Sequence, residues 1–278
     1  MASGEFEFSD QDFQHIRRII NEVAGISLAD SKRELVYSRL SRRLRQLGLR
    51  RFEDYCTLLE SGADTAELSE FVNALTTNLT SFFREPHHFD FLAGELLPTL
   101  VRERGLTNRR LRIWSAGCST GEEPYTIAMV VRETLPTAGW DIKILATDLD
   151  SNVLSTAQRG IYDWDRVKDL PEARRRRWFL KGCGAREGQV RVAPALCDLI
   201  TFRRLNLMEE WPMSGAFDIV FCRNVVIYFD KPTQRVLFDR FADRLIEQGY
   251  LFVGHSESLF KVTERFAPLG KTIYRRCI

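Results

Sequence analysis

The sequence predicts an α/β protein in which a doubly wound parallel sheet follows an all-helical N-terminal domain and carries a small inserted β-subdomain. Three features of the chain lead to this prediction. Helical periodicity runs through roughly the first hundred residues, apolar strands alternate with helices from Leu111 onward, and residues 160–199 form a connection too long for an ordinary loop. The expected parts are residues 1–76, an interdomain segment 77–98, and residues 99–278 with the insert at about 165–200.

The N-terminal helices are predicted from their caps and apolar stripes. Ser9 stands where it can cap the first helix, and Gly25 ends that helix, because glycine readily adopts the left-handed conformation at a helix C-terminus. Further helices are expected over residues 31–47, 52–59 and 65–75. The second helix is expected to bury a stripe that consists of Leu35, Val36, Leu40 and Leu44.

The second half of the chain has the pattern of a parallel sheet. Helices are expected to begin near Glu122 and Ser151, and another to span residues 233–248. Such alternation indicates right-handed crossovers between parallel strands. The expected strands are residues 111–116, 142–148, 200–206, 217–224 and 250–256, and residues 267–277 are expected to add an antiparallel edge strand.

Residues 111–125, LRIWSAGCSTGEEPY, are the most informative stretch. A strand runs into a small-residue turn that opens a helix, which is where open α/β sheets bind nucleotide-like ligands. Glu122 and Glu123 head this helix, and carboxylates there disfavour a pyrophosphate because the helix N-terminus otherwise attracts anions. The acids fit a cofactor with ribose hydroxyls and positive charge, such as S-adenosylmethionine. One of them can equally serve only to stabilise the helix end.

Asp148 ends the second predicted strand. A carboxylate at this strand end commonly receives the ribose hydroxyls of an adenosine cofactor. The alternative is an ordinary surface carboxylate, since Asp150 follows two residues later. Together with the preceding turn, the position favours ribose binding by Asp148.

Residues 117–121 also match the G-x-S-x-G pattern of serine hydrolases, with Asp218 and His255 following in the order of that triad. In that fold the nucleophile follows a middle strand, and an earlier loop supplies the oxyanion hole. Here the strand that leads to Ser119 is the first of the predicted sheet, and the chain before that strand is predicted to be helical and contains no HGGG-type loop. A hydrolase is therefore the weaker interpretation.

The second predicted helix and the residues after it are strongly basic. Residues 32–51 contain eight Lys or Arg side chains and a single acid, Glu34, whereas a solvated helix usually mixes both signs. The excess indicates an anionic partner. An acidic protein surface fits, and nucleic acid is disfavoured because aromatic side chains for base stacking are not interleaved. The basic run 174–177 is interpreted as a solvated helix face.

Composition limits the remaining possibilities. No apolar run approaches the ~20 residues that span a bilayer, and the N-terminal residues lack the pattern of a signal peptide. The six cysteines are scattered without a CxxC pair, which favours a reducing cytoplasm over disulfides or zinc. His87, His88 and His255 show no ligand spacing, so no metal site is expected.

Several motifs in order resemble the chemotaxis receptor methyltransferases, the CheR-type protein-glutamate O-methyltransferases. The resemblance covers nearly the whole chain and includes the helical domain with its RLSRRLRQLGL. The turn departs from the common G-x-G-x-G of methyltransferases, because Ser119 occupies the middle position. The matching motifs are residues 74–89, 115–128, 146–150, 217–230 and 254–258.

The resemblance implies a class I methyltransferase (Rossmann-like) fold, S-adenosylmethionine as cofactor and S-adenosylhomocysteine as product. It places Arg84 and Tyr228 beside the transferred methyl group. The implied cofactor contacts are Asn78, Thr80, Arg84, Glu123, Asp148, Asn206, Leu207, Arg223 and Asn224.

The implied partner is the cytoplasmic domain of methyl-accepting chemoreceptors. The basic helix would dock on the receptor's methylation helices through Arg39, Arg42, Arg43 and Arg45. The insert resembles a subdomain that can bind a C-terminal receptor pentapeptide. We expect a monomer that inserts into no membrane and binds no nucleic acid.

Two rival hypotheses remain at this point. A catalytically silent, cofactor-sensing module would show a damaged site, yet the implied residues are all present. A nucleic-acid methyltransferase would show a [DN]PP[YFW]-type motif or a nucleophilic Cys, and the stretch FCRNVVIYF contains neither.

Overall fold

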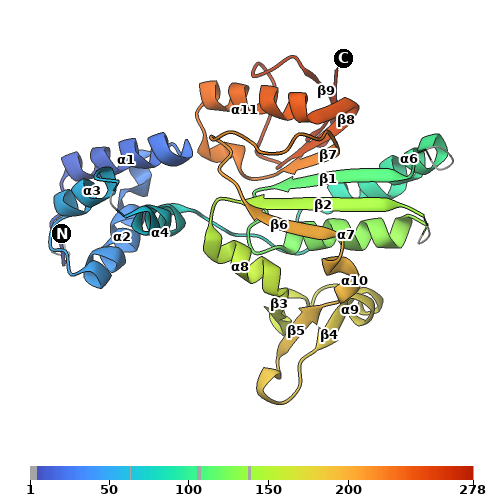
Figure 1. The fold of residues 1–278 in the computed structure, drawn as a ribbon, viewed down its shortest axis with the longest axis horizontal. Coiled ribbons are helices and arrows are strands. Elements are labelled where there is room, and N and C mark those ends of the chain that lie inside the picture. Colours follow the sequence, from blue (N-terminus) through green and yellow to red (C-terminus); the bar gives the residue numbers. More distant parts are fainter. Residues whose placement is uncertain (1–4, 63, 105–107, 137–138, 278) are drawn as a thin grey trace.

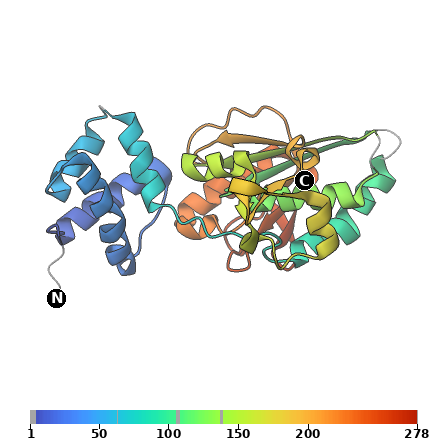
Figure 2. The same cartoon turned by 90° about the horizontal axis from the view of Figure 1, so that it is seen from below.

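The computed structural model describes residues 5–62, 64–104, 108–136 and 139–277. Four helices gather at one end of the molecule, and an extended segment joins them to a larger domain built on a sheet (Figures 1 and 2). The four helices are α1 (Asp10–Ala24), α2 (Arg33–Leu47), α3 (Phe52–Glu60) and α4 (Thr65–Leu75).

The first helix forms where its caps predict it. The Ser9 hydroxyl accepts a hydrogen bond from the Asp12 amide while the Asp12 carboxylate bonds back to the Ser9 amide, which makes a capping box. Gly25 ends the helix with a φ of 70°. The prediction that Leu35 of α2 is buried in the helical domain was wrong. Leu35 is only partly buried and lines a cavity that faces the sheet domain.

A buried ion pair holds α2 against α4. The guanidinium of Arg43 contacts the carboxylate of Glu67, which is 3% exposed and also accepts a 2.7 Å hydrogen bond from the Tyr55 hydroxyl. Arg39 donates to the backbone carbonyls of Ala74 (3.2 Å) and Thr76 (2.6 Å). Arg39 and Arg43 are therefore bound inside the domain, whereas Arg42 and Arg45 are exposed.

The segment that leaves α4 becomes helical again after residue 86. It continues through α5 (His87–Phe91), a π-helical stretch (Leu92–Leu96) and α6 (Leu97–Arg104). Part of the expected interdomain segment is thus a helix that packs on the sheet, since Phe89, Leu92 and Leu96 lie in its core.

The described residues form a mixed seven-stranded sheet in the order β6-β2-β1-β7-β8-β10-β9. The first five strands in that order pair in parallel, and the last two are antiparallel. The doubly wound prediction is confirmed for this parallel part. Its strands are β1 (Arg110–Ala116), β2 (Asp141–Asp148), β6 (Ile200–Arg204), β7 (Phe217–Cys222) and β8 (Leu245–Val253), and the antiparallel pair is β9 (Phe266–Gly270) and β10 (Ile273–Arg276).

Alternate residues of the central strands enter two different cores. Ile113 and Ile219 pack with α7 (Glu122–Thr134), while Trp114 and Val220 pack with α11 (Lys231–Arg244) on the other face. Helix α8 (Ser151–Arg159) follows β2. Both faces of the sheet are therefore covered, which explains why the central strand β7 is buried along its whole length.

Two details of the C-terminal part differ from the sequence prediction. The helix expected over residues 233–248 ends at Arg244, because Leu245 already pairs with Phe217 as the start of β8. The final residues form a hairpin of two strands instead of one edge strand.

The insert is a small antiparallel sheet in the order β3-β5-β4, as predicted. It begins slightly earlier than expected, at Ile161, and lies to one side of the main sheet (Figure 1). Its elements are β3 (Ile161–Asp163), α9 (Glu172–Trp178), β4 (Phe179–Lys181), β5 (Gln189–Val192) and α10 (Pro194–Cys197). None of the helices in the described residues is long and apolar enough to cross a membrane.

The internally bound and the exposed arginines of α2 should differ in their contribution to the free energy of unfolding. Arg43→Ala leaves the buried Glu67 carboxylate without its charged partner, so we expect the free energy of unfolding to fall by about 3 kcal/mol. Arg42→Ala, on the exposed side of the same helix, should change it by less than about 0.5 kcal/mol. Chemical denaturation measures both, and equal losses would contradict the assignment.

Candidate active site

A cavity of about 480 Å³ lies between the helical domain and the carboxyl ends of β1, β2 and β7. Its walls come from the α1–α2 connection, the segment after α4, and the loops that follow these strands. Every residue predicted for cofactor binding or catalysis lines it. These residues are Asn78, Thr80, Arg84, Glu123, Asp148, Asn206, Leu207, Arg223, Asn224 and Tyr228.

The turn after β1 brings the backbone of Gly117 to the cavity wall. Gly117 has a φ of 85°, and a Cβ at this position would lie 2.3 Å from a methyl carbon of Val225. Only glycine therefore fits between the β1 and β7 loops. Gly121 begins α7 with a φ of 99°. Ser119, with a φ of 48°, donates from its hydroxyl to the Asn78 carbonyl at 2.8 Å.

The two glutamates at the start of α7 point to different places. Glu123 lines the cavity, accepts a 2.7 Å hydrogen bond from Ser115 and pairs with Arg223 at 2.9 Å. Burial raises the pKa of Glu123, although Arg223 opposes the shift. Glu122 is fully buried and contacts Arg166 of the insert. The sequence prediction favoured Glu123 for the cofactor, and only Glu123 is part of the cavity wall.

Asp148 stands at the end of β2 with both oxygens oriented by backbone amides. One oxygen accepts from the Ser119 amide at 2.8 Å and the other from the Asp150 amide at 3.0 Å. Removal from water raises its pKa to about 6, although these hydrogen bonds oppose the shift. The carboxylate is therefore fixed at the cavity wall, with a pKa well above that of an exposed aspartate.

The segment after α4 enters the cavity as extended backbone. The Asn78 side chain donates to the Asp150 carboxylate at 2.7 Å, and the Thr80 carbonyl accepts from Arg166 at 2.7 Å. Arg84 donates to the Leu79 carbonyl at 2.7 Å. These contacts attach the segment to the β2 loop on one side and to the insert on the other.

Glu85 was missed by the sequence analysis and joins three elements. It accepts a 2.7 Å hydrogen bond from the His255 ring and lies 3.3 Å from the Arg223 guanidinium. Burial would raise its pKa, but these partners lower the pKa to about 2. Ligand atoms of Glu85, His87 and His88 lie within 4.8 Å of one another, yet the adjacent guanidinium disfavours a cation there.

The helical domain closes the cavity by direct hydrogen bonds to the sheet domain. The side-chain amide of Asn206 donates to the Val23 carbonyl at 2.7 Å, and the backbone amide of Ser27 donates to the Tyr228 carbonyl at 2.8 Å. Leu207 is nearly buried beside them. Residues of α1 and the following connection are thus part of the site, although nothing in their local sequence indicates it.

The hydrolase interpretation is wrong. Ser119 bonds to the Asn78 carbonyl, Asp218 pairs with Arg104, and His255 pairs with Glu85. The three side chains are engaged separately and do not form a triad.

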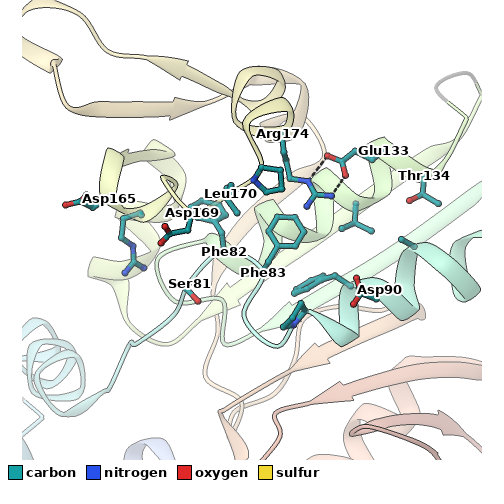
Figure 3. A pocket seen from close by; sticks show the side chains of 16 residues that line it. Ser81, Phe82, Phe83, Asp90, Glu133, Thr134, Asp165, Asp169, Leu170 and Arg174 are labelled. Atoms are coloured by element: carbon teal, nitrogen blue, oxygen red, sulfur yellow. Dashed lines mark hydrogen bonds and ion pairs between the residues drawn. The ribbon is translucent and has the colours of Figure 1, made fainter.

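A second cavity has a volume of about 610 Å³. It lies between residues 81–93 of the chain after α4, helix α7, and residues 165–174 of the insert (Figure 3). Arg174 bonds to Glu133 at 3.0 Å and covers the ring of Phe83 at 4.2 Å. The interpretation of Arg174 as part of a solvated face was therefore wrong. None of the predicted cofactor residues lines this second cavity.

Comparisons with known proteins identify the family of the chain. Residues 78–275 match the family described as "CheR methyltransferase, SAM binding domain", and residues 11–76 match "CheR methyltransferase, all-alpha domain". The chain is 46% identical to the chemotaxis protein methyltransferase 2 of Pseudomonas aeruginosa, over 97% of this chain and 94% of that protein.

A chemotaxis protein methyltransferase of Escherichia coli is also 46% identical, over 96% of this chain and 91% of that protein. One from Borreliella burgdorferi is 39% identical, over 89% of this chain and 88% of that protein. The matches extend through both the helical domain and the sheet domain whose loops build the cavity. The chain therefore belongs to the CheR family of S-adenosylmethionine-dependent chemotaxis methyltransferases.

Proposed function

We propose that this enzyme methylates glutamate side chains on the cytoplasmic helices of chemoreceptors and gives glutamate methyl esters for chemotactic adaptation. The observation that carries the proposal is the cavity between the domains, where the ten predicted cofactor and catalytic residues come together from distant parts of the chain. A silent, cofactor-sensing module would be expected to have lost some of them. The intact set disfavours that alternative.

The cavity suits S-adenosylmethionine on several grounds. Asp148 offers an oriented carboxylate for ribose hydroxyls, and Gly117 allows close approach to the backbone. Glu123 and Asp148 place two carboxylates near a positively charged sulfonium. Arg223 is part of the cavity wall and provides a positive charge for the carboxylate of the cofactor's amino acid part.

The reaction needs little acid–base chemistry from the protein. The bound cofactor supplies an electrophilic methyl group on sulfur. A glutamate with an ordinary pKa of about 4.3 is already ionised at neutral pH, so its oxygen can attack without a general base. We assign to Arg84 and Tyr228 the work of holding this carboxylate in line with the methyl group and excluding water.

The docking surface on the receptor side follows from which arginines of α2 are available. Arg39 and Arg43 make the internal contacts described above, so we propose that Arg42 and Arg45 face the acidic receptor. Arg45 already contacts Glu5 at 2.8 Å, an exposed pair of the kind that a partner easily displaces. Methylation removes negative charge from the receptor, so a basic surface favours the unmethylated substrate over the product.

The insert is proposed as the site for a receptor's C-terminal pentapeptide. Strands β3 and β4 are the edges of its sheet, and an extended peptide can add to such an edge through main-chain hydrogen bonds. Leu180 on β4 is 55% exposed and offers an apolar contact beside that edge.

One assay tests the main proposal. Methyl-labelled S-adenosylmethionine is incubated with the enzyme and a chemoreceptor cytoplasmic fragment, and the label on the receptor is treated with base. We expect base-labile label, as for an ester. Binding of the cofactor without transfer to any receptor fragment would favour the sensing module instead.

Removal of the proposed carboxylate-holding groups should slow turnover. We expect Tyr228→Phe and Arg84→Ala each to lower kcat by at least about tenfold, because the nucleophile loses an orienting contact in the transition state. Cofactor affinity, measured by calorimetry, should change much less for Tyr228→Phe. Wild-type turnover in both variants would refute their catalytic assignment.

The affinity for the cofactor should depend on pH through Asp148. Binding favours the ionised carboxylate, so affinity is highest above pH 6 and falls as the pH drops through about 6, by up to about tenfold per unit. Asp148→Asn should bind weakly with a flatter profile between pH 5 and 7.5. A wild-type slope that persists in Asp148→Asn would assign the titration to another group, such as Glu123.

Charge reversal on α2 should weaken receptor recognition alone. We expect Arg42→Glu to raise the KM for the receptor roughly three- to tenfold at low salt, with cofactor affinity unchanged. Arg110→Glu, an exposed reversal at the opposite end of β1, serves as the matched control. Equal effects of the two variants would argue against a docking role for Arg42.

A further inference from the structure

The loop after β7, residues 223–228, carries five residues of the cavity wall: Arg223, Asn224, Val225, Ile227 and Tyr228. Its backbone turns sharply, because Asn224 has a φ of 58° in the left-handed region. Such a loop needs contacts that hold it in place. Arg223 is fixed by Glu123 and Glu85, but those ion pairs do not reach the far end of the loop, where Tyr228 stands.

A buried carboxylate in the connection after β8 holds the remaining part of the 223–228 loop. Glu257 is 4% exposed, and one of its oxygens accepts from the Asn224 amide at 2.8 Å and from the Gly254 amide at 2.5 Å. The other oxygen accepts from the Ile227 amide at 3.3 Å. The carboxylate thus connects residues near both ends of the 223–228 loop and joins them to the turn after β8.

The turn that carries Glu257 packs closely against the loop, with Gly254 against both the side chain and the backbone of Asn224. A Cβ on Gly254 would lie 2.4 Å from the amide nitrogen of the Asn224 side chain. On the other side of the loop, the Tyr228 carbonyl accepts from Ser27 of the helical domain. The loop is therefore clamped between Glu257 and the helical domain.

Glu257 is absent from the lining of the cavity, so it acts through the loop and touches neither cofactor nor receptor. Burial of a carboxylate is costly unless hydrogen bonds compensate it, and backbone amides of Gly254, Asn224 and Ile227 do so here. Burial still raises the pKa of Glu257 despite these amides. Three backbone amides donate to its two oxygens, a pattern that suits a carboxylate, since a carboxamide has only one acceptor oxygen.

We propose that Glu257 is a positioning residue for methyl transfer: its carboxylate fixes the 223–228 loop so that Tyr228 meets the receptor glutamate in the cavity. This inference rests on the proposed function. It gives a role to the GHSES motif, residues 254–258, which the cofactor and docking assignments leave unused.

The test compares Glu257→Gln with Glu264→Gln, an exposed change farther along the same connection. The carboxamide keeps the shape of Glu257 but turns one acceptor into a donor that faces backbone amides. We expect kcat for receptor methylation to fall at least tenfold, cofactor affinity to stay within about threefold because Arg223 keeps its own partners, and Glu264→Gln to match the wild type.

A double-mutant cycle with Tyr228→Phe separates positioning from general stability. If Glu257 acts through the placement of Tyr228, Glu257→Gln should lower kcat far less in the Tyr228→Phe background than in the wild type. Should Glu257→Gln fail to fold, Glu257→Asp, which shortens the side chain by one carbon, goes through the same cycle.

Three results would overturn the proposal: unchanged kcat, parallel losses of kcat and cofactor affinity, or fully additive effects in the cycle. The assay of the wild-type enzyme distinguishes a failure of the proposed function from a failure of the role assigned to Glu257. Absence of methyl transfer by the wild type would refute the proposed function itself, whereas wild-type transfer together with any of these three results refutes only the role of Glu257.

Discussion

The guanidinium of Arg223 is the contact on which the site depends. It follows β7, pairs with Glu123 at the start of α7, donates to the Arg84 carbonyl and lies beside Glu85. One buried cation therefore neutralises two carboxylates and ties the sheet, the first crossover helix and the interdomain segment together. Loss of the cation would leave buried charges unpaired, and such charges are far more costly than the pair they came from.

This arrangement also explains why the cavity tolerates several acids. Glu123, Asp148 and Glu85 lie at or near its wall, and each would repel the others in a medium that excludes water. The Arg223 guanidinium offsets the negative charges of Glu123 and Glu85, while hydrogen bonds from backbone amides stabilise the carboxylate of Asp148. The wall can therefore present negative charge to a sulfonium without unfolding the loops that carry it.

Most of the fold could be predicted from local sequence signals, whereas most of the cavity residues were implied only by the family resemblance. Ser9 and Gly25 define α1, and the apolar runs of β1 and β7 define the central strands. The partners of individual side chains could not be predicted. Arg39 and Arg42 are three residues apart on one basic helix, yet Arg39 reaches the end of α4 while Arg42 faces water. Only the packing of α2 against α4 distinguishes them.

The same limit applies to Leu35, Glu85 and Glu257. Leu35 fits the apolar stripe of α2, but that end of the helix meets the sheet domain and not the helical core. Glu85 and Glu257 meet their partners across long sequence separations, which no local pattern encodes.

Helix α2 therefore serves three neighbours along its length. Leu35 and the preceding Lys32 line the interdomain cavity, Arg39 and Arg43 hold α4 and the backbone that follows it, and Arg42 is the exposed residue proposed to meet a partner. The proposed recognition element is consequently not a separable module. Transplanting this helix between relatives would also alter the wall of the interdomain cavity, so an exchange of the proposed receptor contacts would carry a change of the cavity with it.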